Sequence, residues 1–61
     1  MNIEEIEQLA AEVFGSAEMA KQWLSAPNLV LGASPASMLN TEAGRNEVRK
    51  VLMAVAAGGV V

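Results

Sequence analysis

The chain has 61 residues, of which 52% are apolar, and a formal net charge of −3. This length supports one domain, and so short a chain buries only about 60% of the surface that it exposes when unfolded. Small domains are commonly stabilised by disulfides, by a metal ion or by a partner subunit. The sequence has no Cys and no His, which excludes disulfides and the usual zinc ligands. We therefore expect a partner subunit, and apolar surface that an isolated copy leaves exposed.

The charge pattern argues against nucleic-acid and membrane proteins. Seven Glu outnumber the four basic residues, whereas nucleic-acid modules carry clustered positive charge. The chain begins without the basic start and apolar run of a signal peptide. The uncharged stretch 51–61 is shorter than a membrane span, which needs about 20 residues. We expect no nucleic-acid binding by this domain alone, no membrane association and a cytoplasmic location.

The first predicted element is an amphipathic helix over residues 3–14. Asn2 is a suitable N-cap, and Glu5 follows three residues later, as in a capping box. Gly15 supplies a left-handed cap at the other end. Apolar residues recur at helical spacing on one stripe, which consists of Ile3, Ile6, Leu9, Ala10, Val13 and Phe14.

The second predicted helix covers residues 17–25. Ser16 is its N-cap, and Pro27 ends it because proline disfavours helix at the preceding residue. The inner face consists of Ala20, Trp23 and Leu24. We interpret Trp23 as a core residue packed against Phe14 and Leu52, with ligand stacking or an interface as the alternative.

A loop and a short helix are predicted next. The loop, residues 27–32, contains the apolar run Leu29, Val30 and Leu31. Such a run could be a strand, but no second strand is available to pair with it, so we expect a buried loop. Ser34 then serves as N-cap of a short helix over residues 35–39, with Pro35 in its first turn. Met38 and Leu39 are expected to point inward.

The last and longest helix is predicted over residues 42–57, with Thr41 as N-cap. Its apolar stripe consists of Gly44, Val48, Val51, Leu52 and Val55. No charged residue follows Lys50, so the end of this helix is apolar on all sides. A second copy or a different protein would cover such an end. The alternative is a tail that folds back on the core or frays.

Taken together, these elements predict an all-α fold. We expect a small bundle of three main helices plus one short helix, in a single domain over residues 1–61.

Few side chains could support catalysis. The sequence has no His, Cys, Asp or Tyr, so no base is available to activate Ser16, Ser34 or Thr41, which we interpret as helix caps. The glutamates of residues 3–14 are expected on a solvated helix face. We therefore predict no enzyme activity, no metal site and no cofactor. The basic residues Arg45, Arg49 and Lys50 either steer an acidic partner or belong to a solvated helix face.

The ordered pattern from Val13 to Gly58 resembles the toxin-binding domain of Xre/MbcA/ParS antitoxins. The matching residues are Phe14, Gly15, Ala20, Trp23, Leu24, Pro27, Asn28, Leu31, Gly32, Pro35, Leu39, Thr41, Gly44, Val48, Leu52 and Gly58. Members usually carry an upstream helix-turn-helix region, which this sequence lacks, so DNA binding is not implied. The sequence also has Gly32-Ala33 where the family often has two glycines. Near the terminal glycine it has Ala56-Ala57 and Val60-Val61, where an aromatic or charged residue is frequent.

The resemblance implies a bacterial antitoxin that binds a RES-domain toxin, an enzyme that consumes NAD⁺. It also implies a helical domain that forms homo-oligomers and obstructs the toxin's active site with its C-terminal end. Framework positions would be Trp23, Leu24, Pro27, Gly32, Pro35 and Gly44. The toxin-binding residues would be Arg49, Met53, Val55, Ala56, Gly58, Gly59, Val60 and Val61. The alternative is an orphan helical oligomerisation domain without a toxin partner.

Overall fold

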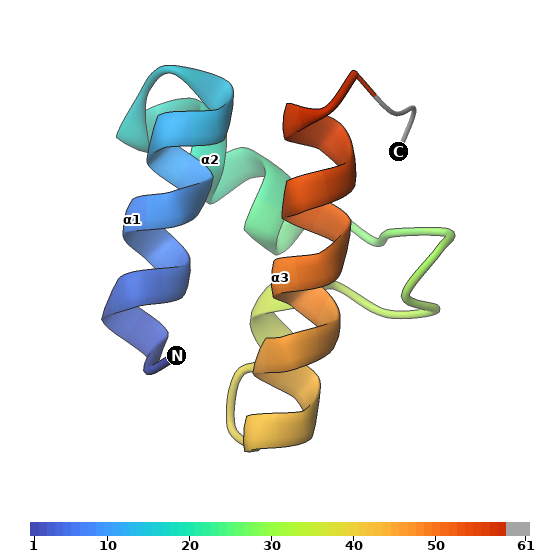
Figure 1. The fold of residues 1–61 in the computed structure, drawn as a ribbon. Coiled ribbons are helices and arrows are strands. Elements are labelled where there is room, and N and C mark those ends of the chain that lie inside the picture. Colours follow the sequence, from blue (N-terminus) through green and yellow to red (C-terminus); the bar gives the residue numbers. More distant parts are fainter. Residues whose placement is uncertain (59–61) are drawn as a thin grey trace.

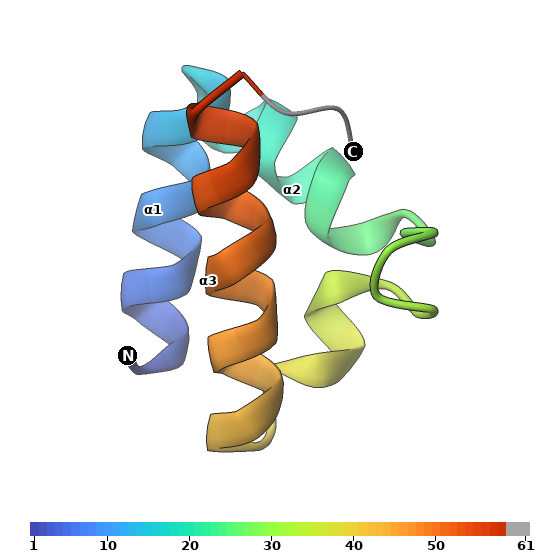
Figure 2. The same cartoon turned by 45° about the vertical axis from the view of Figure 1, so that its right-hand side comes forward.

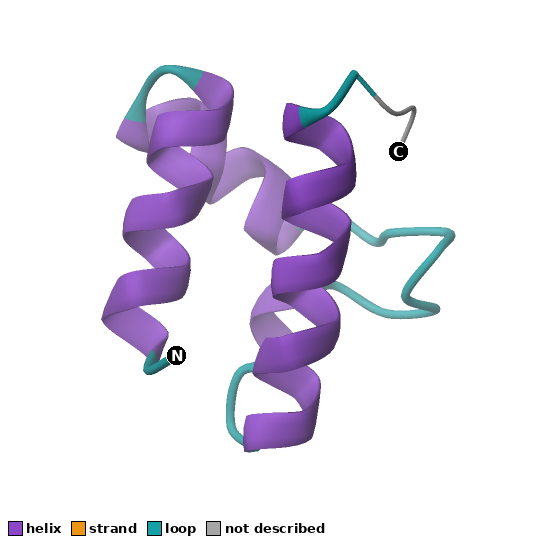
Figure 3. Ribbon diagram, viewed as in Figure 1, coloured by secondary structure: helices purple, strands orange, loops and turns teal. Residues whose placement is uncertain are grey.

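The structure is a computed structural model that describes residues 1–58. In chain order it contains α1 (Ile3–Phe14), α2 (Ala17–Ser25), the 3-10 helix η1 (Pro35–Met38) and α3 (Glu42–Ala56) (Figure 1). The described residues form no strand beyond one isolated bridge in the loop after α2 (Figure 3). The prediction of an all-α fold with three main helices and one short helix is confirmed. The predicted bounds are correct for α1 and α2, while η1 and α3 each end one residue earlier than predicted.

Side-chain caps define both ends of α1. The Asn2 Oδ1 accepts from the Glu5 N–H at 2.8 Å, and the Glu5 Oε1 accepts from the Asn2 N–H at 2.8 Å. This is the predicted capping box. At the other end Gly15 has a φ of +84° and donates its N–H to the Ala11 carbonyl at 2.8 Å. A residue with a Cβ resists this left-handed conformation, so the glycine fixes where α1 stops.

Two of the three remaining predicted caps are confirmed. The Ser16 Oγ accepts from the Met19 N–H at 3.1 Å, and the Thr41 Oγ1 accepts from the Gly44 N–H at 3.0 Å. The prediction for Ser34 was wrong, since its side chain makes no capping hydrogen bond. Its carbonyl instead accepts from the Ser37 hydroxyl at 2.7 Å. The capped ends show that Ser16 and Thr41 have structural roles, as expected.

The core lies between α2 and α3, where both α1 and η1 contact these two helices. α1 packs against both α2 and α3, and η1 also packs against both, whereas α2 and α3 have no close backbone approach in residues 1–58. Figures 1 and 2 show α1 and α3 side by side and running in the same direction. The buried apolar cluster consists of Ile6, Ala10, Ala20, Leu24, Leu39, Val48 and Leu52.

Trp23 lies at the edge of this core. Its ring centroid is 5.4 Å from that of Phe14, with an interplanar angle of 37°, which is within the range of favourable aromatic pairs. The indole is partly buried and packs against the core cluster. The predicted contact with Phe14 is therefore confirmed, and one part of the indole is still accessible.

η1 and α3 approach each other at Gly44. This glycine is buried in the first turn of α3. A Cβ added there would overlap the carbonyl oxygen of Met38 and lie 2.9 Å from its carbonyl carbon. The main chain at the end of η1 therefore lies directly on α3, at a distance that only glycine permits.

The loop between α2 and η1 differs from its prediction. Leu29 is fully exposed and Val30 is 67% exposed, whereas Leu31 is partly buried against the core. The reason is Asn28, which is buried and whose Oδ1 accepts from the N–H groups of Val30 (2.9 Å) and Leu31 (3.1 Å). Because a turn that folds around Asn28 directs the next two side chains outward, the expectation that Leu29 and Val30 are buried was wrong.

Replacing Gly44 with Ala should destabilise the domain by about 2–3 kcal/mol, because the added methyl group must displace the main chain of Met38. This loss outweighs the gain of about 1 kcal/mol that alanine brings over glycine in a helix interior. Urea unfolding followed by circular dichroism measures the change. Asn46→Ala, at an exposed position of the same helix, is the control and should be neutral or stabilise by about 0.5 kcal/mol. A Gly44→Ala domain as stable as the wild type would contradict the close approach.

Candidate functional site

The predicted binding residues occupy the C-terminal half of α3 and the turn after it. Met53 is 50% exposed, Ala56 and Gly58 are exposed, and Arg49 and Val55 are partly buried. The remaining predicted residues, Gly59, Val60 and Val61, lie outside the described residues. Within residues 51–58 no side chain carries a charge. The end of α3 is therefore an exposed surface of apolar and small side chains.

The helical spacing divides these residues between two faces. Arg49, Met53 and Ala56 are spaced i, i+4 and i+7, so they lie along one stripe of α3 that faces away from the core. Val55 instead follows the buried Val51 by four residues and continues the inner face. Arg49, Met53 and Ala56 thus form a continuous stripe. Val55 does not belong to this stripe, because it lies on the inner face of α3.

The end of α3 is also electronegative. The Ala57 N–H donates to the Met53 carbonyl at 3.0 Å, and the Gly58 N–H donates to the Val55 carbonyl at 3.0 Å. Gly58 has a φ of +91°, which turns the chain away from the helix axis. The last carbonyl groups of a helix carry a partial negative charge of about half an elementary charge. No basic residue lies in the last turn to offset it.

The basic residues of α3 do not form a joint patch. The Arg45 Nε donates to the Met1 carbonyl at 2.9 Å, and its Nη1 donates to the Leu39 carbonyl at 2.8 Å. Lys50 forms an exposed ion pair with Glu47 at 3.4 Å. Arg45 therefore links the first residue of the chain to the end of η1, which is a structural role. Arg45 and Lys50 thus have partners within the chain. Of the three basic residues that we considered for steering an acidic partner, only Arg49 is still a candidate.

The described residues show no arrangement suited to catalysis. The glutamates of α1 are exposed, and residues 1–58 contain no group of three or more acids that could hold a metal ion. No helix in this part of the chain is long and apolar enough to cross a membrane. Ser16 and Thr41 use their hydroxyl groups as caps.

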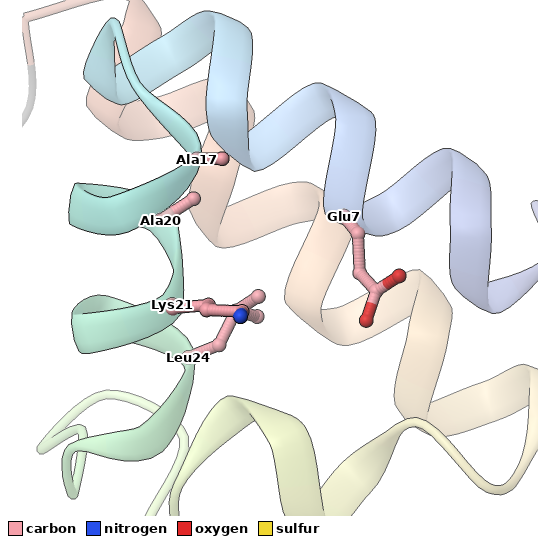
Figure 4. A pocket seen from close by; sticks show the side chains of 5 residues that line it. All are labelled: Glu7, Ala17, Ala20, Lys21 and Leu24. Atoms are coloured by element: carbon pink, nitrogen blue, oxygen red, sulfur yellow. The ribbon is translucent and has the colours of Figure 1, made fainter.

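A shallow groove between α1 and α2 is not suited to catalysis or to cofactor binding (Figure 4). Its lining consists of Glu7, Ala17, Ala20, Lys21 and Leu24. The groove has a volume of about 200 Å³, below the roughly 300–1,000 Å³ of most small-molecule sites. It presents one carboxylate, one ammonium group and apolar side chains, which do not form a catalytic set. We assign it neither a cofactor nor a substrate.

The loop tip, Leu29 and Val30, is a surface that sequence reasoning missed. Both residues had been expected in the core. The signal that could have revealed them is the spacing of Asn28 and Gly32, because Asn is favoured at turn starts and Gly at turn positions with positive φ. Gly32 indeed has a φ of +75°. A tight turn over four residues leaves the apolar side chains at its apex without neighbours.

The sequence matches a family of known proteins. Residues 9–58 match the family described as the antitoxin Xre/MbcA/ParS C-terminal toxin-binding domain. The chain is also 41% identical over 54 residues to a protein named antitoxin Xre from Pseudomonas putida strain KT2440, a match that covers 87% of this chain and 34% of the relative. The chain thus spans about a third of that relative's length. No solved structure matches the chain.

Replacing Arg45 with Met should destabilise the domain by about 1–2 kcal/mol. The substitution removes the two hydrogen bonds to the Met1 and Leu39 carbonyls, and bonds of this charged type contribute about 1.5–3 kcal/mol where they are shielded from water. Thermal and urea unfolding measure the loss. Lys50→Met, which removes only an exposed ion pair, is the control and should change stability by less than about 1 kcal/mol. Equal effects of the two substitutions would contradict a structural role for Arg45.

Proposed function

Because the chain belongs to the Xre/MbcA/ParS family of antitoxin C-terminal toxin-binding domains, we propose that it neutralises a RES-domain toxin that consumes NAD⁺. The domain acts as a stoichiometric inhibitor in the cytoplasm and has no activity of its own. The observation that carries this proposal is the exposed, uncharged end of α3. Such a surface is costly for an isolated protein and typical of an interface core.

The proposed inhibition is a physical obstruction of the toxin's active site by the end of α3. NAD⁺ carries a pyrophosphate, and sites for phosphates are lined by cations and backbone N–H groups. The end of α3 combines apolar side chains with the negative pole of the helix dipole, and no basic residue lies in its last turn. It therefore complements a positively lined cleft better than a basic helix end would.

Within this proposal the stripe residues have distinct roles. Met53 and Ala56 are exposed and apolar, so they contribute buried area against the toxin. Arg49 lies one turn before Met53 and can pair with a carboxylate at the rim of the cleft. Gly58 together with Gly59, Val60 and Val61 would extend into the cleft.

A second candidate function is self-association without a toxin. The exposed apolar loop tip, Leu29 and Val30, favours it because a surface of this kind is unrelated to the end of α3. We propose that the domain associates with copies of itself whether or not a toxin is bound. A RES-type reading frame next to the gene favours the toxin-neutralising function, and its absence favours the orphan oligomerisation domain.

Replacing Ala56 with Lys should weaken the complex with the adjacent RES-type protein at least about tenfold, because an ammonium group would be buried in an apolar contact that faces a positively lined cleft. In a mixture of equal amounts, NAD⁺ consumption should rise accordingly. Ala43→Lys, at an exposed position in the first turn of the same helix, is the matched control and should inhibit like the wild type.

Removal of residues 58–61 tests the occlusion step separately. We expect the shortened domain to bind the toxin through α3 while it inhibits NAD⁺ consumption less completely. Isothermal titration gives the affinity, and a fluorescent NAD⁺ assay gives the residual activity. Full inhibition by both altered domains would rule out the end of α3 as the inhibitory element.

A further inference from the structure

We propose that Met53 is an oxidation site, and that its conversion to the sulfoxide releases the end of α3 from its protein partner. The inference rests on the proposed function, because it takes the stripe of Arg49, Met53 and Ala56 as the contact with the toxin. It adds a regulatory modification to that contact, with a peroxide as the oxidant.

The sulfur of Met53 is open to solvent. The chain has four Met and no Cys, so thioethers are its only sulfur groups. The Met53 side chain is 50% exposed and lies outside the core cluster, whereas Met38 packs against that cluster. A peroxide therefore reaches the Met53 sulfur without any opening of the domain, and oxidation there leaves the core unchanged.

The reaction is a two-electron oxidation of the thioether to a sulfoxide. The sulfur attacks one oxygen of hydrogen peroxide, an S–O bond forms and the O–O bond breaks. The proton on the transferred oxygen passes to the departing hydroxide, which leaves as water. The product has a strongly polar S–O group in place of an apolar sulfur, and methionine sulfoxide reductases reverse the change.

Met53 lies at the centre of the stripe. It follows Arg49 by four residues and precedes Ala56 by three, and side chains at these spacings are neighbours on a helix. A sulfoxide oxygen at this position would be buried in the middle of an apolar contact. Because burial of a polar group without a hydrogen-bond partner is unfavourable, the modification weakens the complex and not the fold.

The sulfoxide oxygen also affects Arg49. Among the basic side chains of α3, the hydrogen bonds and the ion pair within residues 1–58 belong to Arg45 and Lys50. The guanidinium of Arg49 is therefore free to donate, and an acceptor oxygen one turn away at Met53 is within its reach. A bond between them draws Arg49 away from a carboxylate at the rim of the toxin's cleft. One modification thus removes two contacts with the toxin.

Met19 is an internal reference for this reaction. It is 52% exposed, and it lies on α2, which has no close backbone approach to α3 in residues 1–58. The two sulfurs should therefore react at similar rates in the free domain. In the complex, the proposed contact covers Met53 and leaves Met19 open. Oxidation then acts on the free domain, and the oxidised domain rebinds the toxin poorly.

The test treats the full chain with hydrogen peroxide, removes the peroxide and measures binding to the adjacent RES-type protein by isothermal titration. The oxidised wild type should bind at least about tenfold more weakly, with an unchanged thermal midpoint, and methionine sulfoxide reductases should restore its affinity. Met53→Leu keeps an apolar side chain of similar volume and has no reactive sulfur, so it should bind like the wild type before and after peroxide. Met19→Leu is the matched control and should lose affinity on oxidation as the wild type does.

Peptide mass spectrometry of the peroxide-treated complex gives a second readout, in which Met19 should gain an oxygen and Met53 should be protected. Unchanged affinity of the oxidised wild type, together with weak binding by Ala56→Lys, would overturn this inference while the proposed function stands. An equal loss of affinity in oxidised Met53→Leu would assign the effect to another residue and also overturn it. Unchanged affinity in both Ala56→Lys and the oxidised wild type would overturn the end of α3 as the contact, and with it both proposals.

Discussion

The structure depends on the close approach of the Met38 main chain to α3 at Gly44. Because no side chain separates them, η1 lies flat on α3 and brings Leu39 into the core. The Arg45 guanidinium strengthens the same junction by donating to the Leu39 carbonyl.

Within residues 1–58, the end of α3 and the loop tip after α2 are both exposed and uncharged, but they differ in their physical character. The end of α3 combines small apolar side chains with the negative pole of a helix, which suits a cleft lined by positive charge. The loop tip instead has branched apolar side chains on a turn that the Asn28 side chain holds by hydrogen bonds.

Local signals in the sequence were sufficient for the helices, because capping depends on neighbouring residues. Asn2, Gly15, Ser16 and Thr41 all behave as their residue types predict. The end of α3 could be predicted to be apolar from the absence of charge after Lys50. Tertiary features could not be predicted in this way. The attachment of Arg45 to the Met1 carbonyl depends on where distant segments of the chain lie. The exposure of Leu29, in contrast, follows from a local turn around Asn28 that was overlooked.

The full exposure of Leu29 has a consequence for how such domains diversify. Its side chain contributes nothing to the core of its own chain, and the turn that carries it is held by Asn28 and by the backbone. Mutation can therefore alter the size or polarity of this position without a penalty in folding. Related chains can therefore differ at this position while they keep a common architecture.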